Sequence, residues 1–134
     1  MAGAEPYVVA IRAIELFQAT EQVDFEKVRQ LALTIPLQGH WLVPVPIESR
    51  TGLVMDGNHR LHAAKLLGLR RLPCVPLGYD DRRVAVRCWR SGVPFDVERV
   101  MSIATRREVL PLKTTRHRFD PPLPKSHIPI ALLG

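Results

Sequence analysis

The chain has 134 residues, of which 46% are hydrophobic and 24% charged, and its net charge is +6. This length and composition predict one domain with a hydrophobic core and exclude a globally disordered chain. No apolar run approaches the length that crosses a bilayer, and Met1–Pro6 lacks the basic and apolar regions of a signal peptide. We therefore expect a single cytoplasmic domain without a membrane partner.

The positive charge is compatible with nucleic-acid binding and also with an enzyme that acts on anionic substrates. Basic residues are dispersed along the sequence and only 6% of residues are aromatic, which disfavours a base-stacking platform. We predict only weak, sequence-independent and salt-sensitive DNA binding, and no specific nucleic-acid partner. Cys74 and Cys88 are too far apart for a metal or redox motif, so we expect two reduced core residues.

The amino-terminal part is predicted to contain a strand, a helix and an extended segment. Hydropathy alternates over Val8–Ala13 as in a strand. Asp24 is a good N-cap, and apolar residues follow it at helical spacing as far as Pro36, which is expected to end the helix. Trp41–Ile47 contains two prolines, which limit it to an edge strand or an extended connection.

The stretch Thr51–Gly68 contains a predicted strand, turn and helix. Leu53–Met55 is a short apolar run, a candidate buried strand, and Asp56-Gly57 has turn chemistry. From Asn58 the pattern has the helical period, and Gly68 is a plausible C-cap. The broad apolar face of this helix is expected to comprise Leu61, Ala63, Ala64, Leu66 and Leu67.

A dense polar cluster lies where this predicted strand turns into the helix: Asp56, Asn58, His59 and Arg60. A helix N-terminus offers free N–H groups and a positive dipole end, which suit a phosphate. Arg60 and a protonated His59 would add charge-assisted donors. Asp56 indicates a metal ion or proton transfer instead of pure anion binding. The alternative is a capped helix with solvated polar residues.

The carboxy-terminal part is less regular. Leu72–Leu77 is expected to form a short strand interrupted by two prolines, and Val84–Cys88 fits a strand or a helix. Asp96 is predicted to cap a helix. From Phe119 four prolines predict a tail that lies extended over the surface. The apolar face of the Asp96-capped helix is expected to comprise Val97, Val100, Met101 and Ala104.

A second polar cluster spans Lys113–His117, where a lysine, two threonines, an arginine and a histidine follow one another. These groups could form an anion clamp or a basic surface turn, and the sequence leaves both open. Glu21 and Trp89 have ordinary local settings, which suit a surface carboxylate and a core anchor. The chain has no G-x-x-x-x-G-K-[ST] stretch, which excludes a P-loop nucleotide site.

The stretch LVMDGNHRLHAAKLLGLRRLPCV, residues 53–75, resembles the signature of the ParB/sulfiredoxin superfamily. Its members hold nucleotide phosphates on a G-x-x-R turn that opens a helix, which corresponds here to Gly57–Arg60. Sulfiredoxins place a catalytic cysteine directly after the glycine, whereas this chain has Asn58. The resemblance implies an α/β (or α+β) domain in which helices pack around a small mixed sheet.

A narrower resemblance is to the free serine kinases of this superfamily. They carry a D-G-[HN]-H-R turn, an upstream glutamate before a helix, a tryptophan after the next strand region and a late K-T-T-R-H segment. The corresponding positions here are Asp56–Arg60, Glu21, Trp89 and Lys113–His117. Archaeal members insert a long segment before K-T-T-R-H, and this chain has only a short connection there.

The resemblance implies nucleotide-dependent phosphorylation of free L-serine, or a related hydroxy-amino acid, to O-phosphoserine. Glu21 would be the catalytic base, and Asp56 would hold Mg²⁺ or assist proton transfer. The phosphates of ATP or ADP would lie against Gly57, Asn58, His59 and Arg60. The amino acid or the product would contact Trp89, Lys113, Thr114, Thr115, Arg116 and His117.

Two other functions stay open at this stage. One is a nucleotide-binding regulatory or DNA-associated module without metabolic kinase activity. The other is a nuclease-like member of the superfamily. The choice between ATP and ADP, the identity of the hydroxy-amino acid and the oligomeric state are not set by the sequence.

Overall fold

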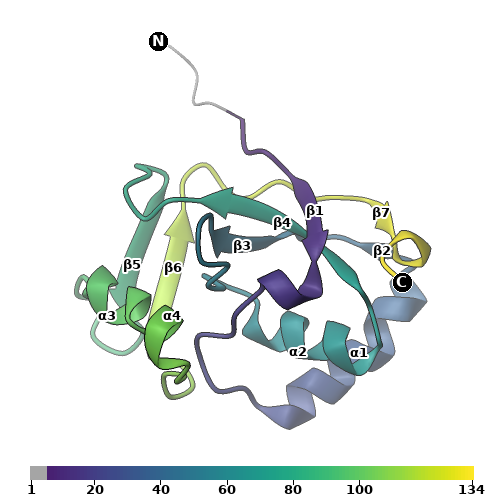
Figure 1. The fold of residues 1–134 in the computed structure, drawn as a ribbon, viewed down its shortest axis with the longest axis horizontal. Helices are drawn as coiled ribbons and strands as arrows, with labels where there is room; N and C mark the ends of the chain where they lie inside the picture. Colours follow the sequence, from purple (N-terminus) through teal and green to yellow (C-terminus); the bar gives the residue numbers. More distant parts are fainter. Residues whose placement is uncertain (1–5) are drawn as a thin grey trace.

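The computed structural model describes residues 6–134, so most of the segment searched for a signal peptide lies outside it. At its centre is a three-stranded sheet of β1 (Ala10–Ala13), β4 (Arg71–Leu77) and β3 (Val45–Glu48), in the order β1-β4-β3 (Figure 1). β1 is antiparallel to β4 and β3 is parallel to it. This mixed sheet with packed helices confirms the predicted fold class.

Different elements cover the two faces of the sheet. Helices α1 (Phe25–Gln38) and α2 (Asn58–Leu66) pack against each other below the sheet in Figure 1. The antiparallel pair β5 (Val84–Cys88) and β6 (Thr115–Phe119) packs beside the other face. The remaining elements are η1 (Ile14–Leu16), β2 (His40–Trp41), α3 (Val97–Met101), α4 (Ile103–Arg106), β7 (Ile128–Pro129) and η2 (Ile130–Leu132).

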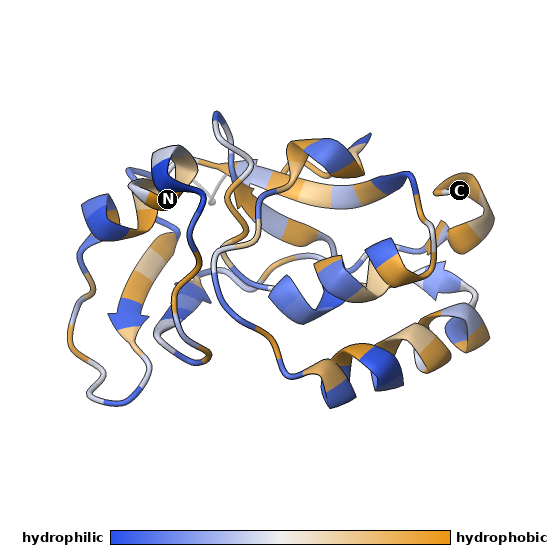
Figure 2. Cartoon of the chain, turned by 60° about the horizontal axis from the view of Figure 1, so that its bottom comes forward, coloured by the Kyte–Doolittle hydropathy of each residue, from blue (hydrophilic) through white to orange (hydrophobic). Residues whose placement is uncertain are grey.

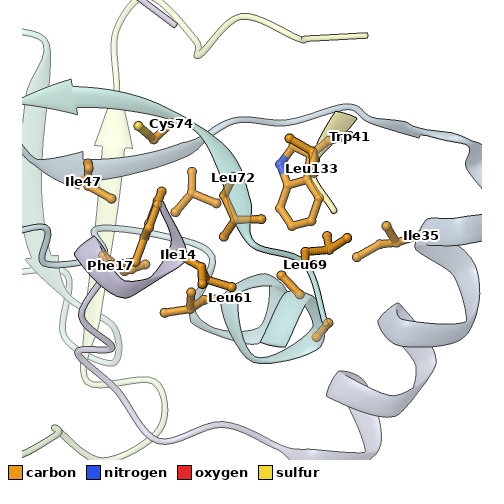
Figure 3. Close-up of a cluster of buried hydrophobic side chains, with 14 of the residues drawn as sticks. Ile14, Phe17, Ile35, Trp41, Ile47, Leu61, Leu69, Leu72, Cys74 and Leu133 are labelled. Carbon is orange, nitrogen blue, oxygen red and sulfur yellow. The ribbon is translucent and has the colours of Figure 1, made fainter. Parts of the chain in front are cut away.

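The main hydrophobic core lies between the sheet and the two long helices (Figure 3). Leu61 of α2, Leu72 of β4 and Leu133 near the carboxyl end are fully buried there. Burying a side chain of this size contributes about 1.5–3 kcal/mol. Helix α1 contributes Val28 and Ile35 from its apolar stripe, while its other faces are polar or exposed (Figure 2). None of the helices in residues 6–134 is both long and apolar enough to cross a membrane.

The amino-terminal predictions are largely confirmed. The strand forms, although it is shorter than predicted, and the Asp24 carboxylate accepts a hydrogen bond from the Glu26 N–H at the start of α1 (3.0 Å). The helix does not end at Pro36 as predicted. It ends at Gln38, and the following Gly39, with φ of 76°, supplies the left-handed stop. Pro36 therefore lies inside the last turn of the helix, not beyond its end.

Leu53–Met55 is buried, but it is not the predicted regular strand. The Val54 N–H bonds to the Gln18 carbonyl (2.9 Å), whereas the Met55 N–H bonds to the Pro46 carbonyl (2.9 Å). Because successive residues bond to different neighbours, they form isolated bridges instead of a continuous ladder.

Helix α2 begins at Asn58 as predicted, but one residue of its expected apolar face is wrong. Leu66 is 64% exposed, whereas Leu61, Ala63 and Ala64 are fully buried. Gly68 follows the helix with φ 72°, and its N–H bonds to the Lys65 carbonyl (3.0 Å). The predicted glycine stop is therefore confirmed.

β4 is longer and more central than its two prolines predict. Its first half, around Pro73, pairs with β1, and its second half, around Pro76, pairs with β3. Each proline therefore lies where the strand has one partner, as on an edge strand, where proline is tolerated. Edge strand β3 fits the prediction for Trp41–Ile47, and the ambiguous Val84–Cys88 is a strand.

The carboxy-terminal predictions are partly wrong. Asp96 caps α3 as predicted, but the expected helix is divided at Ser102 into α3 and α4. The end of the tail does not lie on the surface, because Leu133 is fully buried and β7 pairs with β2. Cys74 is a buried core residue as expected, and burial raises the pKa of its thiol to about 11. Cys88 is half-buried.

Candidate active site

A cavity of about 880 Å³ brings together segments that are far apart in the sequence. It lies between the start of α2, the polar loop before α1 and the beginning of β6. Thr114 is the one predicted site residue absent from its wall, and its hydroxyl donates to the Pro111 carbonyl (2.5 Å). The predicted residues on the wall are Glu21, Asp56, Gly57, Asn58, His59, Arg60, Trp89, Lys113, Thr115, Arg116 and His117.

The start of α2 has the features of an anion site. Gly57 has φ 106°, and a Cβ there would lie 2.8 Å from Nη2 of Arg60. This backbone conformation favours glycine, and the absence of a Cβ lets the Arg60 guanidinium lie close to the turn. No side chain of the described residues caps α2. The N–H groups of its first turn therefore remain available to a ligand.

Asn58 holds the loop that carries Glu21. Its Oδ1 accepts a hydrogen bond from the Thr20 N–H (2.8 Å), and its Nδ2 donates to the Thr20 hydroxyl oxygen (3.1 Å). The Thr20 hydroxyl in turn donates to the Val54 carbonyl (2.7 Å). The Asn58 side chain therefore fixes the loop, which leaves its backbone N–H as the group it can offer to a phosphate.

His59 is not the charged donor that the sequence predicted. Its Nε2 accepts a hydrogen bond from the Asp24 N–H (3.0 Å), so that nitrogen carries no proton. Burial, and secondly the charge of Lys27, lower the pKa of the imidazole. His59 is therefore neutral with its proton on Nδ1, where it can act as one uncharged donor.

Arg60 turns back over the turn that precedes it. Its Nη1 donates to the Val43 carbonyl (2.7 Å). Burial lowers the pKa of the guanidinium, which the charge of Asp56 partly offsets. No carboxylate of residues 6–134 lies within ion-pair distance of Arg60. Its charge is therefore available to a bound anion, although one of its donors is already used.

Glu21 is held by the late polar segment. Its carboxylate accepts hydrogen bonds from the Lys113 N–H (3.1 Å), from the Thr115 N–H (3.0 Å) and from the Thr115 hydroxyl. The backbone supports the same pairing, since the Gln22 N–H bonds to the Leu110 carbonyl (2.8 Å). Glu21 is thus a half-buried carboxylate that joins two parts of the cavity wall, not a surface residue.

Asp56 has a contrasting environment. It is exposed at the cavity edge, and no hydrogen bond or ion pair engages its carboxylate in residues 6–134. Those residues also contain no cluster of three or more His, Cys, Asp or Glu that could hold a metal. Mg²⁺ is commonly held by one or two carboxylates together with substrate phosphates. Asp56 fits this arrangement as a single protein ligand.

Trp89 forms a cationic wall with two residues of the late segment. The indole is 43% exposed. Nζ of Lys113 lies 5.7 Å from its ring centroid and Cζ of Arg116 lies 5.2 Å from it. These are cation–π distances. The wall therefore presents two positive charges and a flat apolar surface to the cavity.

His117 is half-buried and contributes no charge to the predicted clamp. Its Nε2 lies 2.9 Å from the Tyr79 hydroxyl, and its Nδ1 is buried without a partner. Burial lowers the pKa of this imidazole to about 4. The positive charges of the clamp therefore come from Lys113 and Arg116.

The burial of His117 predicts an acid-sensitive fold. Between its folded pKa of about 4 and its ordinary value of 6.5, the unfolded chain binds a proton that the folded chain does not. The stabilisation is complete above that ordinary value, and roughly 3 kcal/mol is lost as the pH falls through this window. Denaturant unfolding from neutral to acidic pH should show this slope, and His117→Gln should remove it.

The control for this experiment is His127→Gln, because His127 is exposed. That variant should keep the wild-type slope. Equal slopes in wild type and His117→Gln would show that other groups cause the acid sensitivity.

Sequence reasoning missed a polar row on α1. Lys27, Gln30 and Thr34 line the cavity at spacings of three and four residues. This spacing is a helical signal, because such residues share one face. On sequence alone the row has the appearance of a solvated face, and only the packing of α1 beside α2 brings it to the cavity.

No family model matches the chain. It is 31% identical over 108 residues to the ATP-dependent L-serine kinase of Desulfurococcus mucosus, covering 77% of this chain and 41% of that protein. It is 31% identical over 55 residues to a ParB-like protein of Sulfolobus acidocaldarius, covering 41% of this chain and 28% of that protein. The chain therefore spans about two fifths or less of the length of these curated relatives.

The fold is similar to several solved structures, among them two of a free serine kinase. A free serine kinase in complex with AMP has a TM-score of 0.83 at 15% identity, with 97% of this chain and 95% of that chain covered. A variant free serine kinase in complex with ADP, in which a glutamate is replaced by alanine, gives the same values. These similarities define a domain with the ParB/sulfiredoxin-like fold. The resemblance to the free serine kinases of that superfamily is confirmed.

Proposed function

We propose that this chain transfers a phosphoryl group from ATP or ADP to the hydroxyl of free L-serine, or of a related hydroxy-amino acid, giving O-phosphoserine. The observation that carries the proposal is the joining of Glu21 to the Lys113–Thr115 segment beside the start of α2. A nucleotide site needs only the start of α2. The additional carboxylate and cationic wall suit a second, zwitterionic substrate.

The nucleotide phosphates are proposed to lie against the first turn of α2. The N–H groups of this turn, the Nδ1–H of His59 and the guanidinium of Arg60 are the available donors. Asp56 is the residue that would hold Mg²⁺, which neutralises phosphate charge when it is bound. The proposal includes both ADP and ATP as donors, because the wall residues named here do not distinguish the length of the phosphate chain.

The amino acid is proposed to lie between Trp89 and Glu21. Lys113 and Arg116 would attract its carboxylate, and a carboxylate of the wall would attract its ammonium group. The serine oxygen attacks the terminal phosphorus, the bond from that phosphorus to the bridging oxygen breaks, and the shortened nucleotide leaves. A carboxylate must take the hydroxyl proton. Glu21 and Asp56 are the two candidates.

A second candidate is a nucleotide-binding regulatory or DNA-associated module, which the similarity to a ParB-like protein favours. Such a module would use the start of α2 and would have no need for Glu21 to contact Lys113 and Thr115. The absence of a specific nucleic-acid partner and the cytoplasmic location, both inferred from the sequence, stay predictions.

The proposal is tested by incubating the chain with ATP or ADP, Mg²⁺ and a panel of amino acids, with products identified by mass spectrometry. We expect O-phosphoserine, or the phosphorylated form of one related hydroxy-amino acid. The His59→Ala variant serves as the control for contaminating kinases, since it should form product far more slowly. Nucleotide binding without phosphorylated amino acid would support the regulatory module, and DNA cleavage would support a nuclease.

A further inference from the structure

The β5–β6 pair has one apolar face and one strongly basic face. In the antiparallel register, Arg87 lies directly opposite Arg116, and Ala85 lies opposite Arg118. Directly opposed residues share a face, as do residues two apart on one strand. The three arginines therefore project from the same face. The other face, which includes Val86, packs towards the core.

This arrangement of charges favours the binding of an anion. Like charges directly opposite each other destabilise a sheet. The ion pairs of residues 6–134 are Arg29–Glu26 and Arg83–Asp81, and neither includes a residue of this face. The hydrogen bond that Arg87 donates to the Gly92 carbonyl (3.0 Å) does not neutralise its charge.

A second cavity, of about 600 Å³, is lined by all three arginines and also by Cys88, His117 and Phe119, which alternate with them along the two strands. Arg87, Arg118 and Gly92 line this cavity and not the first, whereas Trp89, Arg116 and His117 line both. Gly92 has φ 74°, and a Cβ at this position would meet no atom within 4 Å, so the rim is open there. A concave site of this volume suits a small ligand better than the flat surface of a macromolecule.

We propose that this second cavity is an anion site for a small phosphate-bearing ligand, with Arg87 and Arg118 as its own contacts and Arg116 shared with the first cavity. Guanidinium groups bind phosphate oxygens in a bidentate manner. Three of them around one cavity match a ligand with at least two phosphate groups. The inference does not depend on the reaction carried out in the first cavity.

Sharing Arg116 couples the two cavities. An anion that draws its guanidinium away from Trp89 removes one of the two positive charges from the first cavity. Occupation of the second site therefore weakens the binding of an anionic group at that wall, and the reverse effect is equal in size. A phosphorylated metabolite bound there would inhibit the proposed kinase reaction, and this one consequence rests on the proposed function.

The experiment uses pyrophosphate as the probe and follows arginine side-chain N–H resonances and backbone amides by NMR. We expect the Arg87 and Arg118 side-chain resonances to shift on titration. Arg118→Gln should weaken the pyrophosphate affinity derived from the Arg87 resonance by about tenfold or more, the usual effect of losing one charged hydrogen bond. Arg70→Gln is the matched control, because Arg70 is exposed and changes the net charge equally.

Parallel titrations with inorganic phosphate and ADP separate the sources of the phosphate group. Equal pyrophosphate affinity in Arg118→Gln and Arg70→Gln would overturn the proposal, as would shifts confined to the Asn58 and His59 amides. Tighter, salt-sensitive binding of duplex DNA to the same arginines would also overturn it in favour of a polyanionic macromolecule. The ADP titration tests the proposed function separately. Shifts of the backbone amides of α2 would support it, and their absence would count against it, whatever happens at Arg87 and Arg118.

Discussion

Replacing Asp56 by asparagine is expected to lower kcat by roughly 10²–10⁴-fold, the range for losing a group that transfers a proton. The fold should survive, because the carboxylate is exposed and engages no partner in residues 6–134. A surface substitution of this kind changes the free energy of unfolding by less than about 0.5 kcal/mol. Steady-state kinetics and denaturant unfolding of the same preparation measure both quantities.

Asp80→Asn is the matched control, since Asp80 is an exposed carboxylate that is absent from the wall of the candidate active site. It should retain normal turnover. If higher Mg²⁺ concentrations restore the activity of Asp56→Asn, Asp56 holds the metal ion. If the pH–rate profile changes instead, Asp56 takes part in proton transfer. Turnover near the wild-type rate would remove Asp56 from the mechanism.

The start of α2 could be predicted from the sequence because its determinants are local. Gly57 must adopt a conformation that favours glycine, and Arg60 folds back onto that turn from three residues away. Helical periodicity and Gly68 define the rest of the helix. The protonation of His59 was predicted wrongly because its partner, the Asp24 N–H, belongs to a different helix start.

The setting of Glu21 could not be predicted because its partners are 92 and 94 residues away in the sequence. Similarly, Leu133 belongs to a proline-rich tail whose composition indicates a surface segment, yet tertiary packing buries it. The central place of β4 was obscured by two prolines that each occupy a half-paired part of the strand. Long-range packing decides all three cases, and no local pattern records it.

Replacing Glu21 by glutamine tests the proposed base and the link across the cavity together. The carboxylate accepts three hydrogen bonds, from the Lys113 N–H, the Thr115 N–H and the Thr115 hydroxyl. Glutamine has one carbonyl oxygen and one NH₂ group, so its NH₂ must face an N–H donor of the late segment. The variant therefore loses the base and also strains the segment that carries Lys113.

These two losses have different signatures. Loss of general-base catalysis should lower kcat by roughly 10²–10⁴-fold and flatten the acidic limb of the pH–rate profile. Loss of the link should raise KM for the amino acid and lower the free energy of unfolding by about 1–3 kcal/mol. Nucleotide affinity should change little, because the first turn of α2 is held by Asn58 and not by Glu21.

Thr115→Val distinguishes loss of the base from loss of the link, because it removes one hydrogen-bond donor to Glu21 and leaves the carboxylate in place. It should reproduce the effect on KM and part of the loss of stability, while kcat stays within about tenfold of the wild type. Glu26→Gln is the surface control, since the Glu26 side chain is exposed and forms an ion pair with the exposed Arg29. If Thr115→Val loses as much turnover as Glu21→Gln, Glu21 acts by positioning the late segment. If Glu21→Gln keeps near-normal kcat, Asp56 is left as the carboxylate that takes the hydroxyl proton.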